Sequence, residues 1–190
     1  MKIGTRVAIE NHFYCGKCAL CEEKRGDICL NMSQLGHGKG TVYGGCSEYF
    51  IVKEIYCYRL RSNISWQEAA LLEPLGVAHN AVEQVEVNLN ELLITQLDLR
   101  ITRGRNKNLT GCGTIGLFVI SVAKALGCAK VIAADVLSWK LDLAKKMGAD
   151  ELINVKEKDL KSEVMKLTGD IGVQTMIECS GISEVTNMSL

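Results

Sequence analysis

Four cysteines near the start of the chain have the spacing of a metal site. They follow the pattern C-x2-C-x2-C-x7-C and are Cys15, Cys18, Cys21 and Cys29. Short loops with this spacing can bring four thiolates to the corners of a tetrahedron, the geometry that zinc accepts. A zinc ion with four protein ligands has no open position for a substrate, so the predicted site is structural and contributes folding energy. The alternatives are an iron–sulfur cluster, which the wide last gap disfavours, and reduced cysteines without metal.

A glycine-rich turn in the second half of the chain has the pattern of a dinucleotide site. Residues 111–116 read G-C-G-T-I-G, and a predicted helix starts inside them. In this pattern the first glycine permits the tight turn, the second lets a pyrophosphate approach the backbone, and the third allows close packing. The N-terminus of the helix then faces the phosphates.

Asp135 stands at the end of the next predicted strand. A carboxylate there would accept hydrogen bonds from the adenosine ribose and repel a 2′-phosphate, which favours NAD over NADP. An ordinary aspartate at the end of a strand is the alternative. The predicted cofactor-binding residues are therefore Gly111, Gly113, Thr114, Ile115, Gly116 and Asp135.

The composition excludes several classes of protein. Of the 190 residues, 47% are hydrophobic and 23% charged, which fits one soluble domain or two small ones. Lys plus Arg equals Asp plus Glu at 22 each, so no excess charge would hold nucleic acid or a membrane surface. No run approaches the roughly 18 apolar residues of a membrane span, and no signal-peptide core is present. We expect a cytoplasmic protein with neither partner.

The elements that must position these residues change in type along the chain. Up to about residue 60 the sequence predicts small β-strands joined by long loops, with extended runs at Arg6–Ile9 and Glu48–Val52. Ser65 and Glu68 then form a capping box ahead of an apolar run, which predicts the start of a helix.

Beyond about residue 92, predicted strands alternate with predicted helices, which indicates a parallel α/β sheet. The helices are expected at 115–126, 139–147 and 159–168, and the strands at 131–135, 151–155 and 173–178. With an earlier strand at Leu92–Thr95, these elements make up little more than half of a doubly wound nucleotide-binding domain.

The segment just before the glycine turn does not fit a buried strand. Residues 103–108 read R-G-R-N-K-N, whereas a central parallel strand should be apolar. The good candidate at Leu92–Thr95 precedes the turn by the fifteen residues of Gln96–Thr110. We expect this stretch to be an insertion that forms a disordered or poorly fitted loop.

These motifs occur in the order of a known family. The cysteine quartet, G-G-C-S-E-Y at 44–49, E-P-L-G at 73–76, the glycine turn and Asp135 together resemble zinc-dependent medium-chain alcohol dehydrogenases, most closely the sorbitol and threonine dehydrogenase branch. The resemblance implies a partial GroES-like β-domain at 1–66, a connecting helical segment at 67–90 and a partial Rossmann domain at 91–190.

The resemblance also implies a reaction, in which an alcohol or polyol loses hydride to NAD beside a catalytic zinc. That family's catalytic-zinc ligands are an upstream Cys and a His–Glu pair, with a further glutamate in the Glu-Pro motif. Only the last has a counterpart here, Glu73, so we expect the catalytic site to be incomplete within these residues. His79, further along the same predicted helix, is interpreted as a packing histidine. A homo-oligomer is compatible with the family.

Three hypotheses follow from the sequence. The first is a zinc- and NAD-dependent dehydrogenase acting on a secondary alcohol, which the motifs favour. The second is a catalytically inactive zinc-binding fragment of that family, which the missing ligands favour. The third is a zinc-stabilised interaction module that exposes a sheet edge to a partner, for which the sequence has no positive motif.

Overall fold

The computed structural model describes residues 1–38, 44–85, 92–96 and 111–180, with 92–96 described as backbone only. The chain divides into two compact units, Met1–Leu72 and Glu73–Leu190. The division lies inside the segment 67–90 that the sequence groups as one helical connection. No helix among the described residues is both long enough and apolar enough to cross a membrane.

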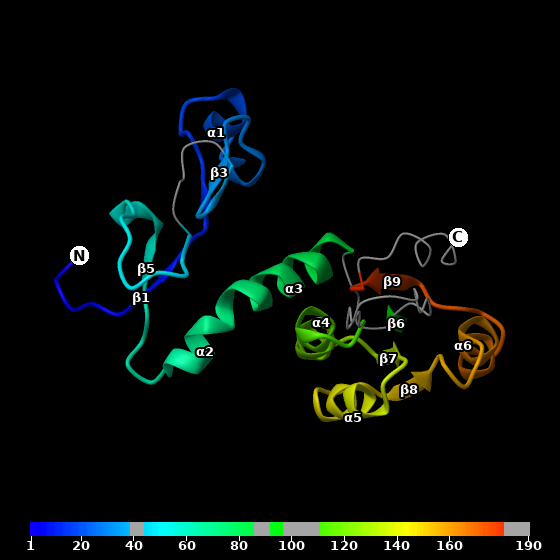
Figure 1. The fold of residues 1–190 in the computed structure, drawn as a ribbon. Helices are drawn as coiled ribbons and strands as arrows, with labels where there is room; N and C mark the ends of the chain where they lie inside the picture. Colours follow the sequence, from blue (N-terminus) through cyan, green and yellow to red (C-terminus); the bar gives the residue numbers. More distant parts are fainter. Residues whose placement is uncertain (39–43, 86–91, 97–110, 181–190) are drawn as a thin grey trace, which may run out of the picture. The chain divides into compact units, whose positions relative to one another are not determined.

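The first unit consists of short strands and single helical turns (Figure 1). Strand β1 (Val7–Ile9) pairs antiparallel with β5 (Cys57–Arg59). A second antiparallel sheet has the order β2-β3-β4. The remaining elements of the unit are β2 (His12–Phe13), α1 (Ala19–Glu22), η1 (Gly26–Ile28), β3 (Ser33–Gln34), β4 (His37–Gly38), η2 (Glu54–Tyr56) and α2 (Trp66–Ala70).

Tyr56 is the centre of packing in this unit. Its side chain is buried, and its ring lies 4.7 Å from the ring of Phe13 and 5.5 Å from that of Tyr14, measured between centroids. The Tyr56 hydroxyl donates to the backbone carbonyl of Tyr14 at 3.0 Å, so the phenol has a partner despite its burial. These contacts fix the start of the cysteine-bearing loop against η2.

The strand expected at Glu48–Val52 does not form, and that prediction was wrong. Residues 45–48 form a bend in which the Ser47 hydroxyl donates to the carbonyls of Gly44 and Tyr49. The side chain of Ile51 is completely exposed. The apolar run at residues 49–52 has no neighbouring strand among the described residues, and a strand without a pairing partner gains no ladder hydrogen bonds.

The second unit is built on a parallel sheet with strand order β8-β7-β6-β9 (Figure 1). The strands and helices alternate along the chain as the sequence predicts. They are α3 (Leu72–Gln84, whose first residue ends the first unit), β6 (Leu92–Gln96), α4 (Thr114–Ala125), β7 (Lys130–Asp135), α5 (Ser138–Lys146), β8 (Glu151–Asn154), α6 (Leu160–Thr168) and β9 (Thr175–Glu178).

Strand β6 confirms the candidate at Leu92–Thr95. It pairs with β7 on one side, Ile94 opposite Ile132, and with β9 on the other, Ile94 opposite Met176. It is therefore an inner strand of the sheet, the place that a strand leading into the glycine turn must occupy. The predicted insertion lies almost entirely outside the described residues.

Strand β7 is buried on both faces, as a central parallel strand should be. Val131 and Ala133 belong to a core cluster that includes residues of α3, α4 and α5. Ile132 and Ala134 belong to a second cluster that includes Val164 of α6. Because successive side chains of a strand alternate between faces, helices cover both sides of the sheet.

Local chemistry accounts for three helix ends, of which the capping box is a confirmed prediction. Ser65 and Glu68 form both hydrogen bonds of the capping box at the start of α2. Asp159 caps α6 by accepting from the Ser162 N–H at 2.9 Å. Gly169 ends the same helix in the left-handed conformation with φ 62°, which glycine adopts without a steric penalty.

Candidate functional site

The structure brings the four predicted zinc ligands together. The sulfur atoms of Cys15, Cys18, Cys21 and Cys29 all lie within 4.8 Å of one another. Sγ of Cys18 is 3.5 Å from that of Cys21 and 3.8 Å from that of Cys29. A tetrahedron with Zn–S bonds of about 2.3 Å has sulfur–sulfur edges of about 3.8 Å, so the four side chains can hold a zinc ion once the widest separations close slightly.

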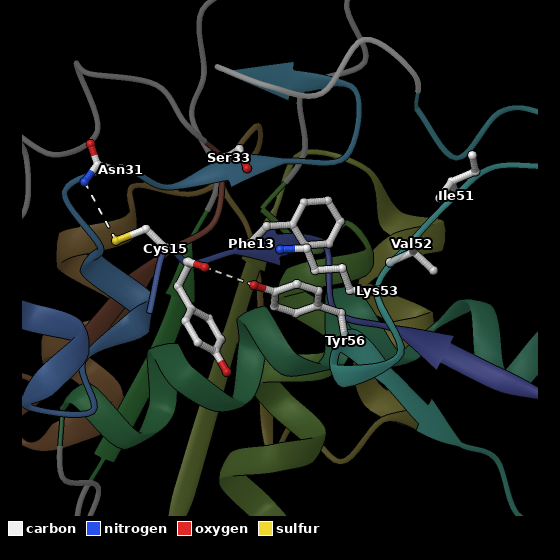
Figure 2. A pocket seen from close by; sticks show the side chains of 9 residues that line it. Phe13, Cys15, Asn31, Ser33, Ile51, Val52, Lys53 and Tyr56 are labelled. Atoms are coloured by element: carbon white, nitrogen blue, oxygen red, sulfur yellow. Dashed lines mark hydrogen bonds between the residues drawn. The ribbon is translucent and has the colours of Figure 1, made fainter. Parts of the chain in front are cut away.

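Backbone and amide donors surround the sulfur atoms. The Cys15 and Asn31 N–H groups each donate to Cys29 Sγ at 3.3 Å, and Nδ2 of Asn31 lies 3.7 Å from Cys15 Sγ (Figure 2). Donors of this kind stabilise thiolates and orient them toward a metal. The sequence analysis did not identify Asn31 as a residue of the metal site. Its only signal in the sequence is its position two residues after Cys29, the last cysteine of the cluster.

Three of the thiols have shifted pKa values. The backbone N–H of Lys17 lowers the pKa of Cys15 to about 6, and that of Cys21 lowers the pKa of Cys18. Desolvation raises the pKa of Cys21 to about 11. A divalent ion that binds all four cysteines as thiolates displaces their thiol protons.

A cavity of about 470 Å³ borders one side of the cluster (Figure 2). Cys15 and Asn31 line it at one end, with Phe13, Lys53 and Tyr56 further along. Cys29, by contrast, is only 6% exposed. The cluster has a buried side at Cys29 and a side that borders open space at Cys15.

In the second unit, the glycine turn presents the start of α4 without a cap. Gly113 is the N-cap residue in an extended conformation, and no side chain caps the helix. A Cβ atom added to Gly116 would overlap the Gly111 carbonyl oxygen and lie 3.6 Å from Cβ of Cys179. Close packing inside the turn therefore requires the third glycine, and the unsatisfied N–H groups of an uncapped helix can bind an anion.

Asp135 lies directly beside this turn. Its side chain is completely buried at the end of β7. One carboxylate oxygen accepts from the Cys112 N–H at 3.0 Å and the other from the Leu137 N–H at 2.9 Å. The structure thus brings the predicted aspartate to the glycine turn, while its contact with a ribose stays a prediction.

Glu73 is not part of a metal cluster. It is exposed in the first turn of α3. Among the residues that the structure describes, the four cysteines form the one group of three or more His, Cys, Asp or Glu side chains able to hold an ion.

His79, interpreted as a packing histidine, is instead exposed, with Nδ1 3.4 Å from a carboxylate oxygen of Glu83. The pair is spaced one helical turn apart on the exposed face of α3.

Comparisons with known proteins assign both units to one family. Residues 1–62 match the alcohol dehydrogenase GroES-like domain, and residues 114–190 match the zinc-binding dehydrogenase domain. The chain belongs to the zinc-dependent alcohol dehydrogenase family. The predicted fold class, a GroES-like β-domain followed by a Rossmann-type domain, is confirmed.

Curated relatives in this dehydrogenase family match along nearly the whole chain. Sorbitol dehydrogenase of Bacillus subtilis is 31% identical over 180 residues, which cover 95% of this chain and 46% of the relative. L-Threonine 3-dehydrogenase of Pyrococcus furiosus is 33% identical over 190 residues, which cover 100% of this chain and 49% of the relative. The chain spans about half the length of the curated relatives it matches.

Solved dehydrogenase structures share the fold. L-Idonate 5-dehydrogenase of Escherichia coli matches with a TM-score of 0.80 and 29% identity, over 97% of this chain and 49% of that chain. An Escherichia coli oxidoreductase of unknown specificity matches with a TM-score of 0.85 and 27% identity, over 98% of this chain and 49% of that chain.

Proposed function

We propose that the protein acts as a zinc- and NAD-dependent dehydrogenase that oxidises a secondary alcohol of a polyol or a hydroxy amino acid. The similarity to relatives named sorbitol dehydrogenase and L-threonine 3-dehydrogenase supports this substrate class. Because the chain spans about half the length of those relatives, the activity is proposed for a protein that also contains the parts of the family's catalytic site not found in these residues.

The observation that carries the NAD assignment is the uncapped start of α4 at the glycine turn. The turn places an extended Gly113 before the helix, and Gly116 packs against Gly111 where no side chain fits. Free N–H groups at a helix N-terminus, together with the helix dipole, bind a pyrophosphate. Asp135 beside the turn supplies the acceptors for the ribose hydroxyls and excludes a 2′-phosphate.

Bound NAD would supply the chemistry of hydride acceptance. The residues of this chain bind and orient the adenosine half of the cofactor. The sheet and its helices hold the turn rigidly, because β7 is buried on both faces.

The zinc that the four cysteines would hold has a structural role. The four cysteines would occupy all four tetrahedral positions of that ion and leave none for a substrate oxygen. The ion would hold the loop from Tyr14 to Asn31 and supply folding energy to the first unit. A catalytic zinc does not fit the described residues, because Glu73 has no ligand partner there, and no step is assigned to one.

The test is dinucleotide binding by the purified chain, measured by calorimetry with NAD and NADP. We expect NAD to bind at least about tenfold more tightly than NADP, a difference of about 1.4 kcal/mol. The Gly116→Ala variant should lose NAD binding, since the added methyl overlaps the Gly111 carbonyl. Gly76→Ala is the matched control, because an added Cβ there meets no atom within 4 Å. Binding of neither dinucleotide by the unaltered chain contradicts the proposal.

A further inference from the structure

Asp135 is the one acidic side chain among the described residues that is completely buried. A carboxylate removed from water is stable only when its oxygens accept hydrogen bonds or meet a cation. The Leu137 N–H that donates to it is two residues away and forms a local turn. The Cys112 N–H is 23 residues away in sequence, so this bond joins the glycine turn to the end of β7.

A second contact joins the same two segments. Cys112 is 1% exposed, and its thiol lies 3.6 Å from the carbonyl oxygen of Ala134, the residue before Asp135. The turn is thus held by β7 through both the backbone and the side chain of Cys112. On its other side it packs against α4 at Gly116.

We propose that Asp135 is a positioning residue that latches the glycine turn in its binding conformation before any cofactor arrives. This inference goes beyond the proposed function, on which it rests only for its effect on NAD. A carboxylate has about four lone-pair positions, and the two N–H groups use two of them, so two are left for other donors. One side chain then sets the position of the turn as well as the choice of cofactor.

The latch is tested without cofactor by the chemical accessibility of Cys112. The unaltered chain, Asp135→Asn and the exposed-site control Asp142→Asn are pulsed with iodoacetamide, and each cysteine is quantified by peptide mass spectrometry. Asparagine keeps the volume of the side chain, but its amide NH₂ replaces one of the two acceptor oxygens. The buried Cys128, 3% exposed just before β7, serves as an internal reference.

We expect Asp135→Asn to raise the alkylation rate of Cys112 about tenfold or more, the effect of losing a charge-assisted hydrogen bond. Cys128 should keep its rate in all three proteins. An unchanged rate at Cys112 overturns the latch. Equal increases at Cys112 and Cys128 also overturn it, because they report opening of the whole unit rather than of the turn.

Cofactor affinity gives the readout that a purely structural role would not move. If Asp135 latches the turn as well as selecting the cofactor, Asp135→Asn weakens NAD without improving NADP, because the loosened turn offsets the lost repulsion of the 2′-phosphate. A carboxylate that only selects the cofactor weakens NAD and improves NADP. The second pattern overturns the latch. An unaltered chain that binds neither dinucleotide contradicts the proposed function instead, and the alkylation result still decides on the latch.

Discussion

The two units of the chain are stabilised in different ways. In the described part of the first unit, the buried apolar side chains are Cys29, Tyr56 and Leu60, and its strands are two or three residues long. The second unit has a sheet whose strand β7 is buried on both faces and two apolar clusters. The small core of the first unit cannot offset the conformational entropy of its chain. This explains why the four candidate metal ligands are found in that unit.

Removing the metal site should give the largest effect and should act on the first unit alone. We expect Cys18→Ser, or treatment of the unaltered chain with a strong zinc chelator, to abolish zinc binding and unfold the loop from Tyr14 to Asn31. Binding of structural zinc contributes on the order of 10 kcal/mol to folding. Zinc content by mass spectrometry and the rate of tryptic cleavage in the loop measure it.

The control for that experiment is Cys57→Ser, which changes a cysteine of the same unit outside the cluster. It should keep one zinc per chain. If Cys18→Ser retains its zinc, or if the second unit becomes protease-sensitive in parallel, then it is wrong that the metal stabilises the first unit alone.

Gly116→Ala should have the next largest effect, and it should act on the second unit alone. The added methyl overlaps the Gly111 carbonyl oxygen, which is backbone and cannot rotate away. Overpacking of this kind costs about 3 kcal/mol. Urea unfolding followed by helical circular dichroism measures the change.

Gly76→Ala on α3 again provides the comparison, because its Cβ points into open space. Alanine is the better helix former, so this variant should be neutral or more stable by up to about 1 kcal/mol. A Gly116→Ala protein as stable as Gly76→Ala would mean that the turn does not pack tightly.

Asp150 tests how polar contacts support the second unit. Burial by itself would raise its pKa, but hydrogen bonds from the Val131 N–H at 2.7 Å and the Lys124 ammonium at 3.0 Å hold the pKa below its ordinary value. Asp150→Asn should therefore lose about 1–2 kcal/mol of stability at pH 7.

The pH dependence of that loss has a defined sign. A carboxyl group with a lower pKa in the folded state stabilises the fold above its unfolded pKa of about 4, and the contribution disappears as the pH falls through the folded value. The unaltered chain and Asp150→Asn should differ at pH 7 and converge near pH 2. A gap that persists at pH 2 in urea unfolding would assign the effect to packing.

The smallest expected effect concerns the capping box in the first unit. Ser65→Ala removes the acceptor for the Glu68 N–H and the hydroxyl that donates to the Glu68 carboxylate, while the backbone N–H of residue 65 still donates to it, and the loss costs about 1 kcal/mol. With zinc bound, the first unit should lose about that much in urea unfolding. A change above about 2 kcal/mol would show that α2 contributes more to the unit than its length suggests.

The same contrast between the units explains what the sequence could predict. Predictions from local patterns were confirmed: the cysteine spacing, the capping box and the alternation of strands and helices all have a cause within a few residues. The strand at Glu48–Val52 failed because a strand needs a partner that its own residues do not specify.

The candidate site was predicted as residue types but not as contacts. The pattern indicated Asp135 as a cofactor residue, yet its bond to the Cys112 N–H depends on how β7 meets the glycine turn. Asn31 was missed for the same reason, because an amide near a cysteine has no spacing rule. Contacts between distant segments follow from packing, which a single sequence does not display.

The hydrogen bond from Cys112 to Asp135 has a consequence for the length of the chain between β6 and the turn. Because the turn is anchored from the downstream strand, its position does not depend on a direct connection to the strand before it. The glycine turn should therefore keep its place against β7 when the number of residues between Gln96 and Gly111 is changed.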